Sequence, residues 1–376
     1  MLAVINELSR HDPQLEVIFV TDRKFGAQAR SLLKNADTEV EVRQVLAGKF
    51  RRYHGVPWIQ QLLDIPTLLK NIRDLFYFAI GTVQSVWLVL RFKPDVIFTK
   101  GGFVCVPVGL AAKLFGVPLV IHDSDAHPGL ANRILARWAA TIATGSPLEN
   151  YDYPAAKSKY VGIPVDNKYK PVNSEEQKKY KAEIGLPDIT KPLVVITGGG
   201  LGAKNINIAA VSVAPKLIEY TAVFHITGEN TFKETRDKAP SRADYMIVPF
   251  VSDKMHRVFG AADVVVTRAG ATAMQELAGM AKPVVIVPNP KLTGGHQLKN
   301  ASVYRDAGAA VVLDEEEMRK HPDILLDALK KLVTDESSRR KLGEKLGRFA
   351  KTDAAVNMAH LIVAAAHKAA RRNVQT

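Results

Sequence analysis

Residues 263–272 have the sequence DVVVTRAGAT, a β-branched run followed by a turn of small residues. The run predicts a buried strand of a parallel sheet, and the turn at Gly270 predicts the start of a helix that reaches Met280. Backbone N–H groups at that helix start would point above the sheet, where the helix dipole favours an anion. The stretch therefore predicts an α/β domain with a corner that suits a diphosphate.

The residues that follow add polar side chains to this corner. A second strand is predicted over residues 283–287, and the loop over 288–295 ends at His296 and Gln297. Glu276 lies in the intervening helix, where its carboxylate can accept hydrogen bonds from two sugar hydroxyls. On spacing alone, a solvated helix glutamate is the simpler interpretation.

The bulk composition predicts a soluble globular chain of two domains, because its 376 residues are 47% hydrophobic and 24% charged. The formal charge of +13 favours an anionic partner, which could be nucleic acid, an acidic membrane surface or a phosphorylated substrate. The sequence shows no RNA-binding signature or zinc-ligand spacing, so no nucleic acid is expected. A single cysteine, Cys105, excludes an internal disulfide and favours a reducing compartment.

The N-terminal half alternates helix-like and strand-like segments, which predicts a second parallel sheet. Its order is unusual, because a helix over residues 2–9 comes before the first strand at 15–20. A doubly wound half should open with a strand and a glycine-rich turn. We therefore expect that one strand and one loop, roughly 15 residues, precede Met1. A rearranged sheet edge is the alternative.

An apolar segment over residues 75–92 is interrupted by Gly81, Gln84 and Ser85. Because it is shorter than the ~20 residues that a spanning helix needs, it predicts a buried or surface-associated helix. A basic and aromatic segment over residues 49–58 precedes it, as at surfaces that bind anionic lipid head groups. An ordinary loop beside a core helix fits these residues equally well.

The second half restarts with a strand over residues 193–197 and the glycine-rich turn GGGLGA over 198–203. This spacing also satisfies the dinucleotide fingerprint G-x-G-x-x-A, so an NAD-dependent enzyme must be considered. The acid after the next strand, Glu229, is farther away than that fingerprint requires. The fingerprint also leaves Glu276 unexplained.

A second polar stretch, HDSDAHPGLANR over residues 122–133, follows a predicted strand over 117–121, and a glycine pair, Gly101-Gly102, follows another over 96–99. Ligands of open α/β sheets bind at such carboxyl strand ends. The pair Asp123 and Asp125 could suggest metal ligands, but so short a motif is usually coincidental.

The second half carries a pattern of charged, amide and small residues, which comprises Arg268, Gly270, Glu276, His296, Gln297, Asn300 and Ala301. It resembles the donor-site signature of GT-B glycosyltransferases, and is most similar to the peptidoglycan enzymes of glycosyltransferase family 28. These enzymes transfer N-acetylglucosamine from UDP to a lipid-linked muramyl-pentapeptide, which converts lipid I to lipid II. The resemblance implies two doubly wound domains, an inverting hexosyltransferase, and no cofactor or bound metal.

The resemblance also implies roles for individual residues. Glu276 would hold the ribose hydroxyls, and Gln297 with His296 would contact the sugar. The implied substrate contacts are Asp125, Asn132, Gly199, Gly200, Gly202, Ala203, Asn207, Phe250, Val251, Arg268, Gly270, Ala271, Thr272, Glu276, His296 and Gln297. In the family, a histidine of the loop that we expect before Met1 is the leading candidate for the general base. Among the residues present, His122 and Asp123 are the candidates for catalytic helpers, although each is also plausibly structural.

Several positions depart from the family pattern. Phe103 stands for a tyrosine, Asp123 for a glutamate, Asp125 for an asparagine, Asp166 for an arginine and Gly200 for a serine. Because the expected base lies before Met1, we predict that this chain binds UDP better than it transfers sugar.

The predicted organisation is an acceptor and membrane-associating domain over residues 1–163, a connection over 164–191, a UDP-sugar domain over 192–350, and a helix over 351–376 that packs back on the first domain. The resemblance implies a peripheral enzyme on the cytoplasmic face of the cell membrane, in contact with UDP-N-acetylglucosamine, the polyprenyl-pyrophosphoryl-muramyl-pentapeptide and an anionic membrane surface. Three alternatives remain: a GT-B enzyme that acts on another lipid such as diacylglycerol, a non-catalytic UDP-sugar-binding membrane protein, and an NAD-dependent enzyme.

Overall fold

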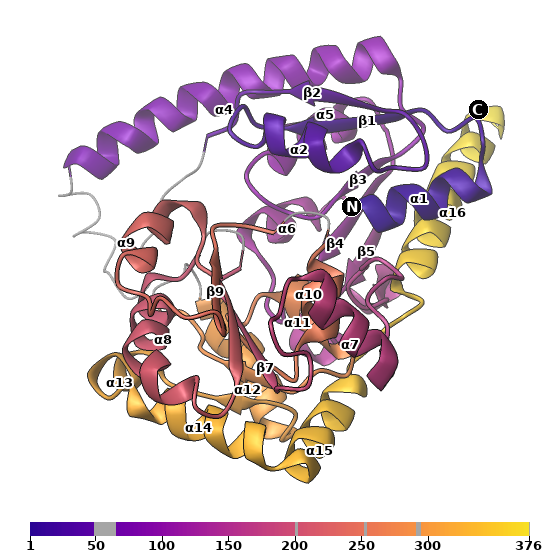
Figure 1. Ribbon diagram of the computed structural model, residues 1–376. Helices are drawn as coiled ribbons and strands as arrows, with labels where there is room; N and C mark the ends of the chain where they lie inside the picture. Colours follow the sequence, from indigo (N-terminus) through magenta and orange to yellow (C-terminus); the bar gives the residue numbers. More distant parts are fainter. Residues whose placement is uncertain (49–64, 200–201, 252–253, 291–294, 376) are drawn as a thin grey trace. The chain divides into compact units, whose positions relative to one another are not determined.

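The computed structural model describes residues 1–48, 65–199, 202–251, 254–290 and 295–375 (Figure 1). The chain separates into two compact units, and the first of them combines both ends of the sequence. Unit 1 contains Met1–Asp166 and Lys351–Thr376, and unit 2 contains Asn167–Ala350. Every paired strand in both units is parallel. The predicted pair of α/β domains is therefore confirmed.

The described strands of unit 1 form two separate sheets. One pairs β1 (Val17–Thr21) with β2 (Val40–Gln44). The other has the order β3 (Ile97–Thr99), β4 (Leu119–Asp123), β5 (Thr141–Thr144) and β6 (Ser158–Tyr160). The helices of this unit are α1 (Leu2–His11), α2 (Gly26–Leu33), α4 (Ile65–Phe92), α5 (Cys105–Leu114), α6 (Leu130–Leu135) and α16 (Ala354–Gln375), with single turns η1 (Leu148–Asn150) and η2 (Ala155–Lys157).

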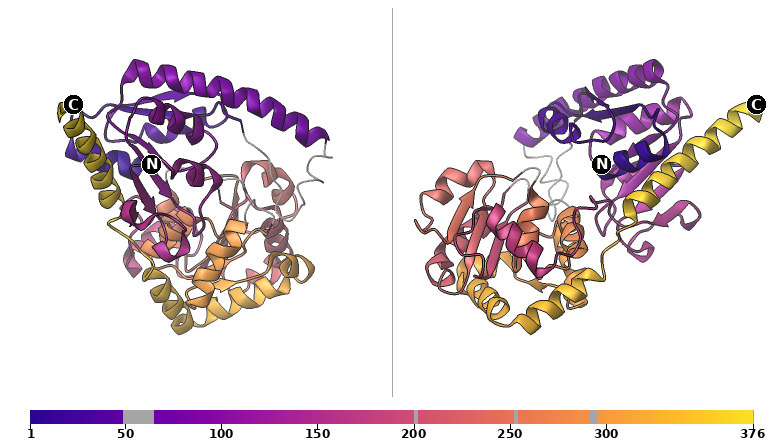
Figure 2. Two further views of the ribbon diagram at one scale, coloured as in Figure 1. Left: turned by 180° about the vertical axis from the view of Figure 1, so that it is seen from behind. Right: turned by 45° about the vertical axis from the view of Figure 1, so that its right-hand side comes forward.

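Helix α1 packs on both sheets of unit 1. Ile5 belongs to a cluster with Ala29 and Leu33 of α2, which covers the β1–β2 pair. Val4 belongs to another cluster, with Val120 of β4 and Met358 of α16. One short helix thus joins the two sheets and the last helix of the chain (Figure 2). The expectation that a strand and a glycine-rich loop precede Met1 stays a prediction.

Unit 2 is built on one six-stranded sheet with the order β12-β11-β10-β7-β8-β9. Its strands are β7 (Leu193–Thr197), β8 (Ala222–Ile226), β9 (Tyr245–Val248), β10 (Val264–Thr267), β11 (Val284–Ile286) and β12 (Val311–Val312). The strand order reverses between β7 and β10, and ligands of open α/β sheets bind at the carboxyl ends of strands at such a point. Both predicted phosphate-binding turns, after β7 and after β10, lie at this reversal.

Helices cover both faces of this sheet, which explains why its central strands are apolar throughout rather than alternating. They are α7 (Ser174–Glu183), α8 (Lys204–Leu217), α9 (Phe232–Arg236), α10 (Met255–Ala261), α11 (Ala271–Gly279), α12 (His296–Asp306), α13 (Glu315–Lys320), α14 (Asp323–Thr334) and α15 (Glu336–Gly347), with one single turn, η3 (Glu229–Thr231).

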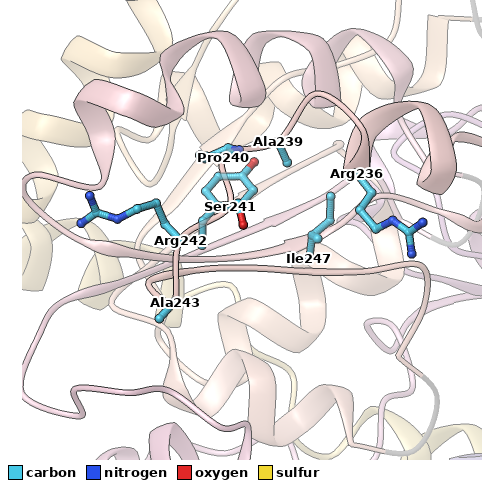
Figure 3. A pocket seen from close by; sticks show the side chains of 8 residues that line it. Arg236, Ala239, Pro240, Ser241, Arg242, Ala243 and Ile247 are labelled. Carbon is cyan, nitrogen blue, oxygen red and sulfur yellow. The ribbon is translucent and has the colours of Figure 1, made fainter.

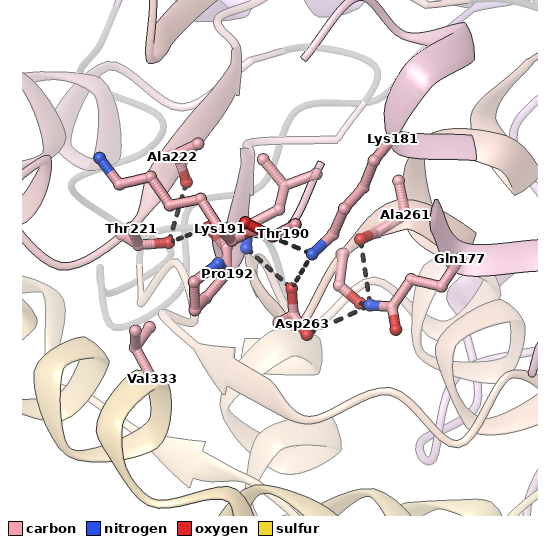
Figure 4. Close-up of polar contacts among 12 residues, drawn as sticks. Gln177, Lys181, Thr190, Lys191, Pro192, Thr221, Ala222, Ala261, Asp263 and Val333 are labelled. Atoms are coloured by element: carbon pink, nitrogen blue, oxygen red, sulfur yellow. Dashed lines mark hydrogen bonds and ion pairs between the residues drawn. The ribbon is translucent and has the colours of Figure 1, made fainter. Parts of the chain in front are cut away.

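Helix α7 lies in the segment that the composition predicts as a connection, and the structure places it within unit 2. Gln177 of α7 donates hydrogen bonds to the carbonyls of Ala261 and Ala262 and to the Asp263 carboxylate (Figure 4). The Lys181 ammonium lies 2.8 Å from the same carboxylate, which also accepts a hydrogen bond from the Leu193 N–H. Asp263 therefore connects α7 to the first residue of β7.

The sequence predicts an apolar helix that is too short to span a membrane. This prediction is wrong about the length, because α4 has 28 residues. Two of the three residues that look like interruptions, Gly81 and Gln84, contact Leu46 in the chain after β2. Gln84 accepts a hydrogen bond from the Leu46 N–H, and a Cβ on Gly81 would overlap the Leu46 carbonyl. The Ser85 hydroxyl bonds the Gly81 carbonyl and is also buried. Small and polar residues thus form the packed face of α4.

The opposite face of α4 is apolar and exposed. Its exposed large side chains are Leu68, Leu69, Ile72, Leu75, Phe76, Tyr77, Ile80, Val83, Trp87 and Leu90. By length and composition alone, the stretch Thr67–Phe92 could cross a membrane. In a core helix the apolar side chains face the protein interior, whereas in α4 they face solvent.

Candidate functional site

Two glycine-rich turns lie at the reversal of strand order in unit 2. The turn after β7 includes Gly199 and Gly202, which have φ angles of 74° and 73°, in the region that favours glycine. Ala203 then caps α8, and Gly270 caps α11 in the turn after β10. Neither helix start receives a hydrogen bond from its capping side chain. Backbone N–H groups at both helix starts are therefore suited to bind an anion.

The resemblance makes Arg268 a substrate contact, but the structure gives its guanidinium partners inside unit 2. It donates to the carbonyl of Val287 at 2.9 Å and to the carboxylate of Glu315 at 2.5 Å. Glu315 also accepts a hydrogen bond from Asn205 at the start of α8. Arg268 thus joins the ends of β10 and β11 to α13 and α8, and Glu315 balances its charge. The sequence does not single out Glu315, which lies in a run of three glutamates.

The predicted sugar contacts lie on neighbouring segments of unit 2. Glu276 is half-buried on α11, and Gly270, Ala271 and Thr272 form the start of that helix. The Asn300 amide of α12 donates to the Ala269 carbonyl in the turn before α11. His296 and Gln297 begin α12, and the Gln297 amide oxygen accepts a hydrogen bond from the Asn289 N–H. The Asn300 contact thus brings the start of α12 beside the turn after β10.

Asn207 was predicted to contact the nucleotide, but it is almost fully buried. Its amide nitrogen donates to the Thr227 carbonyl at 2.9 Å and to the Thr231 hydroxyl at 3.0 Å. Its amide oxygen lies 3.0 Å from Nε2 of His225. The side chain is therefore engaged inside the protein and holds the loop after β8. Sequence reasoning missed His225, which has no motif around it.

Phe250 and Val251 follow β9, where the family resemblance places contacts with uracil. The Phe250 side chain is exposed, whereas Val251 packs partly against the core. Backbone bonds from Thr227 N–H to the Val248 carbonyl and from Gly228 N–H to the Pro249 carbonyl hold this segment beside the loop after β8. The predicted uracil contacts therefore lie at the same sheet edge as the two glycine turns. Gly200 lies outside the described residues.

His122, a predicted catalytic residue, is the second-last residue of β4 in unit 1 and is fully buried. Its Nε2 lies 2.8 Å from the Gly162 carbonyl, so it donates there, and its Nδ1 then accepts from the Ser124 hydroxyl at 3.1 Å. Burial, followed by the nearby Lys100 charge, lowers the pKa of His122 to about 3. Both ring nitrogens are engaged and the ring stays neutral, which is the arrangement of a structural histidine rather than a base.

Asp123, the other predicted catalytic residue, is also buried but keeps an ionisable carboxylate. Its Oδ2 accepts hydrogen bonds from the Tyr153 hydroxyl at 2.8 Å and from the Gly129 N–H at 3.2 Å. Burial raises the pKa of Asp123 to about 6. Raised carboxylate pKa values are typical of acid–base residues. Asp123 is therefore better suited to proton transfer than His122.

Two tyrosines that sequence reasoning missed hold the loop after β4. The rings of Tyr151 and Tyr153 stack with centroids 5.6 Å apart. The Tyr151 hydroxyl donates to the Asp125 carbonyl at 2.6 Å, beside the Tyr153 bond to Asp123. Predicted contact Asn132 lies at the same place, since its amide donates to the His122 carbonyl. The end of β4, α6 and the segment after β5 thus form one polar cluster.

A metal site would need a group of acidic, histidine or cysteine side chains. Over the described residues, no group of three or more such side chains is placed to hold a metal ion. Asp123 instead bonds a hydroxyl and an N–H group, and the Asp125 carbonyl bonds Tyr151. The polar cluster after β4 is therefore a hydrogen-bonded arrangement.

A shallow hollow lies along the edge strand β9 of unit 2 (Figure 3). Its lining includes Arg236 and Arg242, with Tyr245 and Ile247 from β9. No predicted site residue lines it, and Arg242 is already close to the Asp244 carboxylate at 3.6 Å. The hollow is therefore separate from the glycine turns.

Comparison with known proteins shows that both halves of the chain match one enzyme family. Residues 1–144 match the glycosyltransferase family 28 N-terminal domain, and residues 193–358 match the C-terminal domain of that family. A protein of Symbiobacterium thermophilum is 33% identical over 371 residues, which cover 98% of this chain and 92% of the relative. A protein of Lachnospira eligens is 34% identical over 77% of this chain and 76% of its own length. Both are named UDP-N-acetylglucosamine--N-acetylmuramyl-(pentapeptide) pyrophosphoryl-undecaprenol N-acetylglucosamine transferase.

Solved structures agree with this match. The Acinetobacter baumannii MurG crystal structure has a TM-score of 0.68 and 26% identity, over 96% of this chain and 94% of that one. A UDP-GlcNAc 2-epimerase of Neisseria meningitidis has a TM-score of 0.64 over 96% and 95% of the two chains. At 14% identity, the epimerase shares the fold alone.

Proposed function

Because this chain belongs to glycosyltransferase family 28, we propose that it moves N-acetylglucosamine from UDP-N-acetylglucosamine to a polyprenyl-pyrophosphoryl-muramyl-pentapeptide. The predicted family and the predicted GT-B fold are confirmed, and the chain is a glycosyltransferase. The reaction assigned here is the one that the names of the relatives describe. It is the conversion of lipid I to lipid II in peptidoglycan synthesis.

One observation carries the donor half of the proposal: two helix starts without side-chain caps lie at the reversal of strand order in unit 2. An acceptor hydroxyl attacks the anomeric carbon, the bond from that carbon to the diphosphate oxygen breaks, and UDP leaves with the bonding electrons. Backbone N–H groups at Ala203 and Gly270 stabilise the charge that develops on the leaving diphosphate. Arg268 contributes by holding the strand ends, because Glu315 balances its charge.

The residues proposed to contact the ribose and the sugar lie on α11 and at the start of α12. Glu276 accepts hydrogen bonds from the ribose hydroxyls, and Gln297 with His296 orients the sugar above the start of α12. The base that receives the acceptor proton has to be ionised near neutral pH. Within the described part of unit 1, Asp123 fits that requirement, because burial raises the pKa of this carboxyl only to about 6.

The membrane half of the proposal rests on α4. Its apolar face carries Phe76 and Trp87, whose side chains are 65% and 58% exposed, and Arg73 and Arg91 lie exposed on the same helix. Such a helix lies in the plane of a membrane surface, with its apolar side in lipid and its cations at anionic head groups. We place the enzyme on the cytoplasmic face of the cell membrane, where a lipid-linked acceptor is accessible. The basic segment over residues 49–58 lies outside the described residues.

A transfer assay with radiolabelled UDP-N-acetylglucosamine tests the proposal. Transfer by this chain should be slow, and the label that is transferred should appear in the muramyl lipid and not in diacylglycerol. The reverse result would favour the diacylglycerol alternative. In parallel, UDP should raise the melting temperature of the chain by mass action and NAD should not. Glu276→Gln should weaken UDP binding, while Glu219→Gln, on the exposed surface of the same unit, should not. Equal UDP binding by both variants would contradict the assigned ribose contact.

A further inference from the structure

A continuous line of buried hydrogen bonds runs across unit 2 from β9 to the loop after β8. Tyr245 on β9 bonds Nδ1 of His225 at 2.8 Å, and Nε2 of His225 lies 3.0 Å from the Asn207 amide oxygen. The Asn207 amide nitrogen then reaches the Thr227 carbonyl. All four residues are less than one-twentieth exposed, so no bond in this line exchanges freely with water.

The direction of every bond in this line follows from its last member. A backbone carbonyl only accepts, so the Asn207 group beside Thr227 must be the N–H donor, and its other end must be the oxygen. That oxygen can only accept, which requires a proton on Nε2 of His225. Nδ1 is then unprotonated and accepts from the Tyr245 hydroxyl. Burial lowers the pKa of His225 to about 4, which keeps the ring neutral.

The line ends beside Gly202 in the turn after β7. This turn and the turn after β10, at Gly270, form the proposed donor corner. Gly202 lies so close to the loop after β8 that a Cβ on it would be 2.6 Å from the Thr227 carbonyl oxygen. The same carbonyl accepts bonds from Asn207 and from the Thr231 hydroxyl. Its position, and therefore the space left for Gly202, is fixed by these two donors. If Asn207 turned its amide over, two oxygens would face each other and the carbonyl would have to move.

We propose that His225 is a positioning residue for the donor nucleotide. By holding the Asn207 amide in one orientation, it sets the Thr227 carbonyl against Gly202 and so fixes the backbone of Gly202, just before α8, where a nucleoside diphosphate would bind. This inference rests on the proposed function, because it concerns the same donor corner. His225 itself does not touch the nucleotide.

The experiment measures UDP binding to the full chain by titration calorimetry. His225→Leu removes the donor to Asn207, whereas His225→Gln keeps an amide that can reach it. Thr221→Val is the matched control, because it removes an equally buried hydroxyl bond, to the Pro192 carbonyl, just before the other end of β8 (Figure 4). Tyr245→Phe is a milder variant that removes only the first bond of the line. Melting temperatures are recorded for all variants.

We expect His225→Leu to weaken UDP binding by roughly tenfold, which is the effect of one buried amide oxygen left without a donor. His225→Gln should recover most of that loss. Thr221→Val should lower the melting temperature but leave UDP affinity within about twofold of the unmodified chain. If His225→Leu does not fold, the Tyr245→Phe variant should still weaken UDP binding more than Thr221→Val does.

Two results would overturn the inference while the proposed function stands. In one, the unmodified chain binds UDP and the variants at 225 and 245 bind it as tightly as Thr221→Val does. In the other, nitrogen-15 spectra of the histidine rings find the proton of His225 on Nδ1. If the unmodified chain fails to bind UDP at all, the proposed donor site is wrong and the inference falls with it.

Discussion

The guanidinium of Arg268 lies 2.5 Å from the carboxylate of Glu315, and only 9% and 5% of the two side chains are exposed. The pair joins the end of β10 to the start of α13, beside the proposed donor site. Each of these buried charges needs the other as its counter-ion, because a buried charge without a partner destabilises the folded state. The proposed donor site therefore lies beside a buried cation that stabilises the framework of unit 2.

Removal of the charge on Glu315 should be strongly destabilising. Glu315→Gln keeps an oxygen for Asn205 but leaves Arg268 buried without a counter-charge, so we expect the free energy of unfolding to fall by about 3–5 kcal/mol. Urea denaturation measures this. Glu316→Gln breaks the more exposed pair with Arg319 on the same helix and should cost less than about 1 kcal/mol. Similar losses for both variants would contradict a special role for the buried pair.

Asp123 should make the protein less stable as the pH rises from 4 to 6. Burial raises the pKa of this carboxyl from 3.8 to about 6, so the folded state holds a proton that the unfolded state has lost. Folding stability therefore falls through this window and is constant above it. Asp123→Asn removes the effect, so its unfolding free energy should rise relative to the unmodified chain by up to about 3 kcal/mol between pH 4 and 7.

Urea denaturation at a series of pH values checks this expectation. The exposed neighbour Asp152 provides the control, since Asp152→Asn should leave the pH dependence unchanged. A difference between Asp123→Asn and the unmodified chain that is the same at every pH would show that the carboxyl titrates at its ordinary pKa.

The exposed face of α4 should be required for membrane binding. Val83→Asp and Trp87→Glu put charges into the apolar surface, and each should lower the fraction that floats with anionic vesicles by roughly tenfold. Ile208→Asp makes the same kind of change at an exposed apolar position of α8 and should not. High salt should weaken only the contribution of Arg73 and Arg91, so some binding should persist. Unchanged flotation of both α4 variants would eliminate this helix as the docking surface.

Gly202→Ala should disturb the proposed donor corner in two ways: alanine is strained at the positive φ of this position, and its Cβ would contact the Thr227 carbonyl. Gly202 and Gly185 both have positive φ, at 73° and 83°, so alanine at either costs roughly 1–2 kcal/mol. Only at Gly202 does the added Cβ meet another group, the Thr227 carbonyl, whereas the space at Gly185 is open. Urea denaturation should show a larger loss for Gly202→Ala, and calorimetry should show weaker UDP binding for that variant alone. Equal losses would mean that the contact with Thr227 is not restrictive.

The sequence predicts most of the strands, because strands that are buried on both faces are uninterrupted apolar runs. The runs at residues 193–197 and 263–267 become β7 and β10, and the turns after them lie where the strand order reverses. The family resemblance adds which polar residues follow those strands. These features are local, so the order of residues along the chain is sufficient to find them.

What the sequence does not reveal is the partners that lie far away along the chain. Gly81 and Gln84 look like breaks in an apolar helix, but they contact Leu46 in the chain after β2. His122 looks like a base at a strand end, but Gly162 accepts its proton. Arg268 looks like a free cation until Glu315 is beside it. A single sequence does not reveal such pairs, because each depends on how the sheet brings separate segments together.

The cluster that joins Val4 of α1, Val120 of β4 and Met358 of α16 has a consequence for biosynthesis. Unit 1 cannot complete its core until the ribosome has released the last helix, and by then unit 2 has already been translated. We expect nascent unit 1 to expose the apolar side of β4 and α1 throughout that interval, and therefore to rely on chaperones. A premature stop codon just before Lys351 would yield a chain whose unit 2 folds and whose unit 1 aggregates.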